Sequence, residues 1–224
     1  MLKDNIIEKD VKTNEYKVIM AESNTNSRLE AFCDGVFAIA LTLLIIEIKI
    51  PSSETINTTN GLWLALQHLL PSVLAFLLSF IIILISWVNH HSTLKLINKS
   101  SPIFIYANGL LLLTIVIMPF PTALLSEYLF TAHAVPAVVL YATINVFNTI
   151  AWILLFQAAL KPNPLTINEK ATLTARAGQK SSYFALAINT LLLGMAFWFP
   201  QVVALLFGAI WLGWLVYGIR IKNE

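Results

Sequence analysis

Residues 31–50 decide the fold, and they read AFCDGVFAIALTLLIIEIKI. This run is almost entirely apolar and has about 20 residues, the length that an α-helix needs to cross the hydrocarbon core of a bilayer. Asp34 lies about one helical turn inside it, and Glu47 and Lys49 lie near its end. The run therefore predicts a membrane-spanning helix that carries one ionisable side chain inside the apolar stretch.

The composition of the whole chain agrees with a membrane protein. Of its 224 residues, 58% are hydrophobic and 12% are charged, and the mean hydropathy is +0.76. Soluble proteins have about 25% charged residues, so a water-soluble fold is not expected. The formal charge of +2, with no basic run, argues against nucleic-acid binding. A single cysteine, Cys33, excludes an intramolecular disulfide and a cluster of metal thiolates.

Five further apolar runs follow the first, separated by segments of turn and loop chemistry. The runs are approximately residues 69–88, 103–120, 135–160, 183–199 and 202–219. The separating segments are Pro51 to Gly61, Asn98 to Pro102, Pro119-Phe120-Pro121, Lys161 to Pro164, and the tight hairpin Pro200-Gln201. We therefore expect an all-α polytopic membrane protein with six transmembrane helices over residues 28–224. Residues 1–27 are polar, lack the pattern of a secretory signal, and are predicted to form a cytoplasmic arm.

The distribution of Lys and Arg predicts how the chain is oriented. Thirteen of the 14 basic residues fall in the N-terminal arm, the second loop, the fourth loop and the C-terminal tail, and only Lys49 falls on the other side. Basic residues near helix ends are retained on the cytoplasmic side. Both termini are therefore expected in the cytoplasm, which agrees with an even number of spans and with a multi-pass protein of the cell membrane.

Asp34 is the first place to look for function, because an ionisable residue within a span costs roughly 2.5 to 3.5 kcal/mol on insertion. In the expected topology, polar residues from the second and third spans lie at the same depth and can converge on Asp34; they are Trp87, Asn89, His90, His91 and Asn108. Three interpretations are open: a polar clasp that locks three helices together, a proton relay through Asp34 and a histidine, or a metal site. No metal site is expected, since adjacent histidines on a helix point in two directions.

The first span has a second face. On a helical projection Gly35, Ile39, Thr42, Leu43 and Ile46 fall within an arc of about 100°, whereas Asp34 points about 140° away from Ile39. This second face is an apolar stripe with one hydroxyl, and it suits lipid contact or helix packing. Leu44 lies about 140° from Ile39, so its replacement is expected to leave any function of the stripe unchanged.

The first span also carries a motif, Arg28-Leu-Glu-Ala-Phe32-Cys33-Asp34 followed by an apolar helix. It resembles the first-helix motif of the transmembrane protein 175 family of endosomal and lysosomal potassium channels, which is Arg-x-x-x-Phe-Ser-Asp. The family's accompanying motifs are similar to those seen here at Trp87, His90, His91, Asn108 and Pro119-Phe120-Pro121. Cys33 departs from the motif serine, and a thiol is a weaker hydrogen-bonding group than a hydroxyl.

The resemblance implies a prokaryotic single-repeat channel subunit that works as a homotetramer and conducts K⁺ passively. The pore would be lined by the first helix of each subunit, with constricting layers at Ile39, Leu43 and Ile46 and with Thr42 as the polar neighbour. The motif residues would hold this helix in place; they are Arg28, Phe32, Cys33, Asp34, Trp87, His90, His91 and Asn108. The resemblance implies no cofactor and no catalytic residue, and its partners are the bilayer and monovalent cations.

Two other classes of protein remain as alternatives. One is a proton-coupled secondary transporter that uses Asp34 and a histidine, although the spans lack a Gly- or Pro-broken pair in corresponding halves. The other is a membrane enzyme with His90 or His91 as a base, but the sequence has no nucleophile motif and no metal constellation to support it. A channel is therefore the leading interpretation.

Overall fold

The computed structural model describes residues 26–53 and 56–221, which form helices joined by loops. The helices are the first helix Asn26–Glu47, whose last turn is the 3-10 helix η1 Leu44–Glu47, then α2 Thr59–His68, α3 Leu70–Leu94, α4 Pro102–Ile117, α5 Pro119–Tyr128, α6 Ala134–Leu160, α7 Glu169–Ala196 and α8 Pro200–Ile221. Over the described ranges the all-α prediction is confirmed. All but the last two residues of the predicted arm 1–27 lie outside those ranges.

Four stretches of helix are long and apolar enough to cross a membrane. They are Asn26–Glu47, Leu70–Leu94, Pro102–Tyr128 and Ala134–Leu160, and they correspond to the first four predicted spans. The fifth and sixth apolar runs form the C-terminal part of α7 and most of α8, whose described side chains, Pro200–Val216, make up an apolar helix. The chain is thus a helical membrane protein, and six spans and cytoplasmic termini stay predictions.

Two loop predictions were wrong in their boundaries. The predicted apolar runs left residues 161–182 between the fourth and fifth spans, but α7 begins at Glu169, where the side chain of Asn168 accepts a hydrogen bond of 2.8 Å from the backbone N–H of Ala171. This N-cap starts a helix whose first half is polar, and hydropathy cannot distinguish a polar helix from a loop. Lys170, Arg176 and Lys180 therefore lie on a helix.

The segment Pro119-Phe120-Pro121 was expected to end the third span, yet α5 begins at Pro119. Proline is tolerated in the first turn of a helix, where its missing N–H would have no intrahelical partner. Only Met118 separates α4 from α5, and its backbone stays in the right-handed helical region. The third span therefore continues through the prolines to Tyr128.

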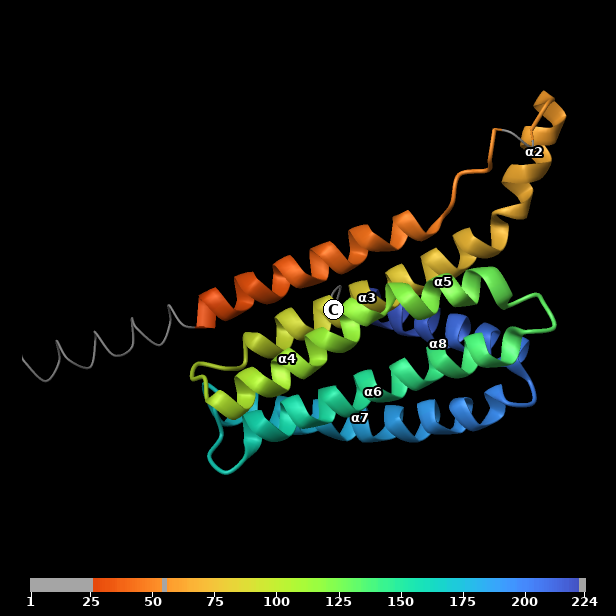
Figure 1. Cartoon of the computed structure of the whole chain (residues 1–224). Coiled ribbons are helices and arrows are strands. Elements are labelled where there is room, and N and C mark those ends of the chain that lie inside the picture. The colour runs from red at the N-terminus through yellow and green to blue at the C-terminus, as the bar shows by residue number, and fades with distance from the viewer. Residues whose placement is uncertain (1–25, 54–55, 222–224) are drawn as a thin grey trace, which may run out of the picture.

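The helices pack as a bundle with the first helix at its edge (Figure 1). α6 packs against α4, α5 and α7, and α3 packs against α5 and α8. In Figure 1 the first helix runs along the side of the bundle formed by α3, α4 and α5, opposite α7. α2 and the segment before it project beyond the end of the bundle. The first helix therefore packs against the bundle along one side and leaves its other side uncovered.

The second and fourth loops lie together at one end of the bundle. The backbone N–H of Asn98 donates to the carbonyl of Leu165 at 3.1 Å, and the N–H of Ile167 donates to the carbonyl of Leu96 at 3.0 Å. The charge distribution had placed these two loops on the same side of the membrane. Their direct pairing agrees with that part of the predicted topology.

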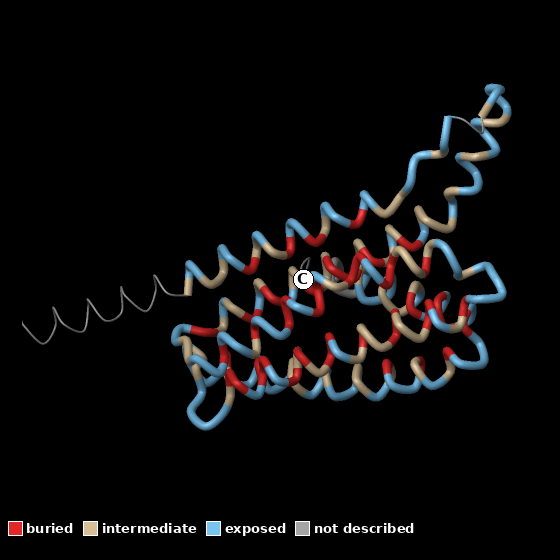
Figure 2. The backbone as a smooth tube through the Cα atoms, viewed as in Figure 1, coloured by how far each residue is buried: buried red, intermediate tan, exposed pale blue. Residues whose placement is uncertain are grey.

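The first helix buries one face and exposes the other. Cys33, Phe37, Ala40 and Leu44 follow one another at helical spacing, and each is at most 1% exposed in the main apolar core. The core also takes residues from α3, α4, α5, α6, α7 and α8. Figure 2 shows buried positions of the first helix toward the bundle and exposed ones on its outer side. Packing of this single face holds the first helix against the bundle.

Replacement of Leu44 by Asn is expected to destabilise the protein, an effect separate from the function of the exposed stripe, from which Leu44 points away. Leu44 is 0% exposed, so the substitution leaves a void and buries an amide without a partner. We expect a loss of about 2 to 5 kcal/mol, measured as a lower melting temperature in detergent. Ile45→Asn, at an exposed neighbouring position, is the matched control, and an equal loss in both variants would contradict the packing described here.

Candidate functional site

Asp34 has a direct partner on the second span. The indole Nε1–H of Trp87 donates to Asp34 Oδ1 at 2.8 Å. Trp87 lies on α3 and Asp34 on the first helix, so the hydrogen bond joins these two helices. A partly buried carboxylate needs such a donor, because the loss of water is otherwise uncompensated. The convergence of Trp87 on Asp34 that the topology suggested is therefore present.

Beside the Trp87–Asp34 bond, a second set of hydrogen bonds links the first helix, α3 and α4. His90 Nε2 lies 2.7 Å from Asn108 Oδ1, and Asn108 Nδ2 donates to Cys33 Sγ at 2.9 Å. All three side chains are at most 1% exposed. Because the Asn108 amide nitrogen is directed at the sulfur, its oxygen accepts from His90 Nε2–H. The thiol that replaces the motif serine thus keeps a partner on α4.

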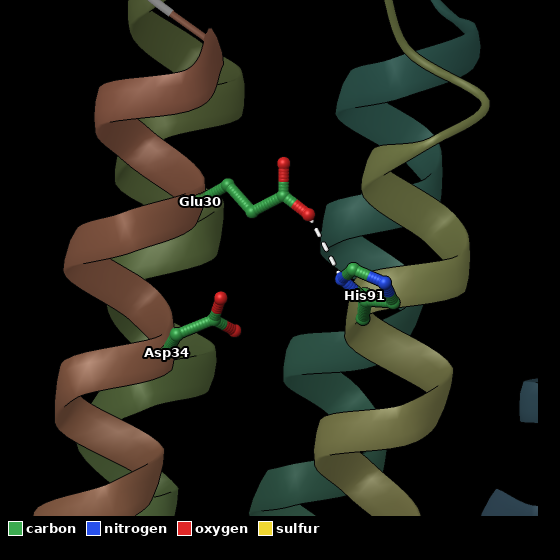
Figure 3. A group of neighbouring side chains, drawn as sticks. All are labelled: Glu30, Asp34 and His91. Atoms are coloured by element: carbon green, nitrogen blue, oxygen red, sulfur yellow. Dashed lines mark ion pairs between the residues drawn. The ribbon is translucent and has the colours of Figure 1, made fainter.

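Glu30, which was not predicted from the sequence, completes a half-exposed group with His91 and Asp34 (Figure 3). His91 Nδ1 lies 2.8 Å from Glu30 Oε1, an ion-pair distance without the alignment of a hydrogen bond. Glu30 and Asp34 are four residues apart and so lie on one face of the first helix, toward α3. This i, i+4 spacing of two carboxylates inside the motif was the available signal.

Three other predicted residues lie apart from these contacts. Arg28 and Phe32 are exposed, on the same side of the first helix as Ile39. Asn89, which the topology placed near Asp34, instead lines a cavity of about 460 Å³ shared with residues of α6 and α7. Adjacent positions on a helix point about 100° apart, so Trp87, Asn89 and His90 cannot all face the same neighbour.

The apolar stripe of the first helix is uncovered. Ile39, Leu43 and Ile46 are 60%, 40% and 69% exposed. Thr42 lies beside them, also exposed, and its hydroxyl donates to the carbonyl of Ile39 at 2.8 Å. This bond ties the hydroxyl to its own helix. The stripe is therefore an apolar face that nothing within the described chain covers.

Fold and site together define a polytopic α-helical membrane protein in which three helices share a buried polar network and the first helix presents a free apolar face. The family model described as endosomal/lysosomal potassium channel TMEM175 matches residues 28–119, which include every residue of that network. The crystal structure of a lysosomal potassium-selective channel TMEM175 homolog from Chamaesiphon minutus is 38% identical, with a TM-score of 0.64 over 84% of this chain and 98% of that one. The chain belongs to the TMEM175 family.

Two further relatives match over part of their length. A potassium channel of Chamaesiphon minutus is 50% identical over 123 residues, which make up 55% of this chain and 60% of that protein. The endosomal/lysosomal proton channel TMEM175 of Gallus gallus is 31% identical over 180 residues, which make up 77% of this chain and 35% of that protein. The chain thus matches 60% or less of the length of these two relatives. The family is one of channels, which agrees with a protein that is not an enzyme.

Trp87→Phe is expected to destabilise the protein, because it removes the donor to Asp34 and leaves a partly buried carboxylate without that partner. The expected loss is about 1 to 3 kcal/mol, seen as a lower melting temperature in detergent. Trp63→Phe, on an exposed position of α2, removes an indole N–H elsewhere and should leave the melting temperature unchanged. Equal melting temperatures for both variants would show that the indole bond does not hold the helices together.

Proposed function

We propose that this chain is a subunit of a moderately potassium-selective cation channel of the cell membrane. Four subunits surround a central pore, and the first helix of each one lines it. The observation that carries this proposal is the free apolar face of the first helix, whose opposite face is anchored in the core. The names of the relatives, potassium channel and potassium-selective channel, support the same function.

The free face suits a pore made by several copies. Each chain offers one helix of this kind, and a single helix cannot enclose a pathway. Arg28, at the start of the exposed side, and Ile39, Leu43 and Ile46 further along it, follow one line of the helix. When four copies meet along this line, the three apolar residues form successive rings around the axis and Thr42 lies at their edge. The polar network then holds each helix at a fixed orientation.

Conduction would be controlled by wetting of the apolar rings. A narrow ring of Ile and Leu side chains excludes water and blocks ions, and a small widening admits water with a partly hydrated cation. No Thr-Val-Gly-Tyr-Gly filter occurs in the sequence, so carbonyl ligands of that kind do not replace the hydration shell. K⁺ sheds water at a lower cost than Na⁺, which gives a preference for K⁺ that is moderate because no cage of ligands enforces it.

The membrane topology belongs to the same proposal. Six spans with both termini in the cytoplasm would place the paired second and fourth loops on the cytoplasmic side, where their basic residues are retained. The polar network lies at the N-terminal end of the first helix and at the C-terminal end of α3. It would therefore lie in the inner leaflet, and the apolar rings would lie nearer the membrane centre.

A proton-coupled transporter is the second candidate, and one contact favours it. Atoms of Asp34, His91 and Glu30 that can bind protons lie within 4.8 Å of one another. A relay needs titratable groups at such distances. The Gallus gallus relative is named a proton channel, so a test of the channel proposal should measure proton flux as well as K⁺ current. Conductance separates the two functions, since a transporter turns over far more slowly than a channel conducts.

Ile39→Asn is expected to raise the single-channel current several-fold and to bring the reversal potential under opposed K⁺ and Na⁺ gradients close to zero. Four amides would replace four apolar side chains on the axis, so the constriction would wet more easily and ions would shed less water. The measurement is the current of purified protein in planar bilayers. The wild-type protein should show discrete single-channel currents, with a reversal potential shifted from zero toward the equilibrium potential of K⁺.

Ile45→Asn is the matched control, because it makes the same substitution at a similarly exposed position of the same helix, about 120° from Ile39. It should leave current and reversal potential as in the wild type. If Ile45→Asn opens the pathway while Ile39→Asn does not, the pore runs along another face. If no variant and no wild-type sample gives discrete currents, the channel proposal fails and slow proton-coupled uptake becomes the function to measure.

A further inference from the structure

Glu30, Asp34 and His91 form a group with the composition of a metal site (Figure 3). Each residue offers one ligand atom, and the three atoms lie within 4.8 Å of one another. The two carboxylates come from successive turns of the first helix, and the imidazole comes from α3 and is directed at Glu30. Nδ1 of His91 and Oε1 of Glu30 are 2.8 Å apart, closer than the roughly 3.3 Å that separates two ligands of a tetrahedral ion with bonds near 2.0 Å.

Two carboxylate oxygens with one imidazole nitrogen suit a transition metal. Zn²⁺ binds His nitrogen and Asp or Glu oxygen in a tetrahedral site, and three protein ligands leave the fourth position to water. Mg²⁺ and Ca²⁺ prefer oxygen ligands alone, and Ca²⁺ takes six to eight of them. The imidazole nitrogen therefore makes this group selective, which a pair of carboxylates would not be.

Neighbouring side chains already orient two of the three ligands. Trp87 Nε1–H holds Asp34 Oδ1 at 2.8 Å, which fixes the carboxylate and leaves its other oxygen for a metal. The indole ring of Trp87 also stacks on the His91 imidazole, with centroids 6.0 Å apart and planes 20° apart. His91 Nδ1 is enclosed and has no hydrogen-bond partner within the described chain. Contacts that orient ligands in this way raise the affinity of metal sites.

The side chains of the group are partly exposed. The side chains of His91 and Glu30 are 36% and 33% exposed, and Asp34 is also partly exposed. The fully buried His90, whose Nε2 is bonded to Asn108, is not available as a ligand through that atom. Of the two adjacent histidines, only His91 therefore faces the carboxylates.

We propose that Glu30, Asp34 and His91 bind one Zn²⁺ or chemically similar divalent transition-metal ion, with water as the fourth ligand. No metal site was expected from the sequence, because adjacent histidines point in two directions and no Glu or Cys was judged to be spaced to complete a site; Glu30 is that missing ligand. The ion joins the first helix to α3 by coordinate bonds at the point where the Trp87–Asp34 hydrogen bond already joins them. The binding itself is independent of channel activity; its effect on conduction, a first helix held in one position, rests on the proposed function.

The test is isothermal titration calorimetry of the purified full-length protein in detergent, with ZnCl₂ and, in parallel, with MgCl₂. We expect one Zn²⁺ bound per chain, with a higher melting temperature when the ion is present, and Mg²⁺ binding at least about 100-fold weaker. Absence of Zn²⁺ binding to the wild-type protein, or equal binding of Mg²⁺, overturns the proposal. Failure of the channel proposal would appear as missing K⁺ current in metal-free protein, so the two outcomes are distinct.

Variants assign the ligands. His91→Gln and Glu30→Gln each remove one ligand and should weaken Zn²⁺ binding by at least about 100-fold, with the change in melting temperature on Zn²⁺ addition lost. His133→Gln, at an exposed histidine outside the group, is the matched control and should bind as the wild type does. Because Glu30 and His91 lie on different helices, one variant remains informative if the other folds poorly. Unchanged affinity in a folded His91→Gln or Glu30→Gln variant overturns the proposal.

Discussion

The hydrogen bond from the indole of Trp87 to the carboxylate of Asp34 is the contact on which the rest of the structure depends. A carboxylate inside an apolar helix is costly wherever it lacks a donor, so Asp34 restricts the first helix to orientations in which it faces α3. The hydrogen bonds between His90 and Asn108 and between Asn108 and Cys33 restrict the orientation of the first helix in the same way, through Asn108 on α4. Polar partners, more than apolar packing, therefore select the rotation of this helix.

Once that rotation is fixed, one face of the first helix is buried and the other is exposed. Apolar packing is not directional, and Phe37 could be buried against many surfaces. The Asp34 contact turns Phe37 and Leu44 into the core and turns Ile39 and Ile46 outward. A helix held in this way presents the same apolar line in every copy of the chain. In the proposed channel, a network away from the stripe therefore matters for a pore built from the stripe, and a metal ion bound at the network would act on the proposed pore helix.

Local patterns in the sequence predicted the helices of the first half and the main partners of Asp34. The apolar runs located the first helix and α3, because an apolar run is a property of one helix, and the expected topology placed Trp87 at the depth of Asp34. The start of α7 at Glu169 was missed because its cap, Asn168, precedes a polar helix that hydropathy cannot detect. Glu30 was missed because its partner, His91, lies on another helix, and only the packing of two helices brings them together.

The central claim is that the outward face of the first helix meets copies of itself on a shared axis. Cysteine cross-linking in native membranes tests it, with Ile39→Cys in a Cys33→Ser background so that no other thiol is present. The account predicts oxidant-dependent cross-linking between subunits at position 39 and none at Ile45→Cys, which lies on a different side of the helix. Cross-linking at position 45 with none at position 39 would contradict it.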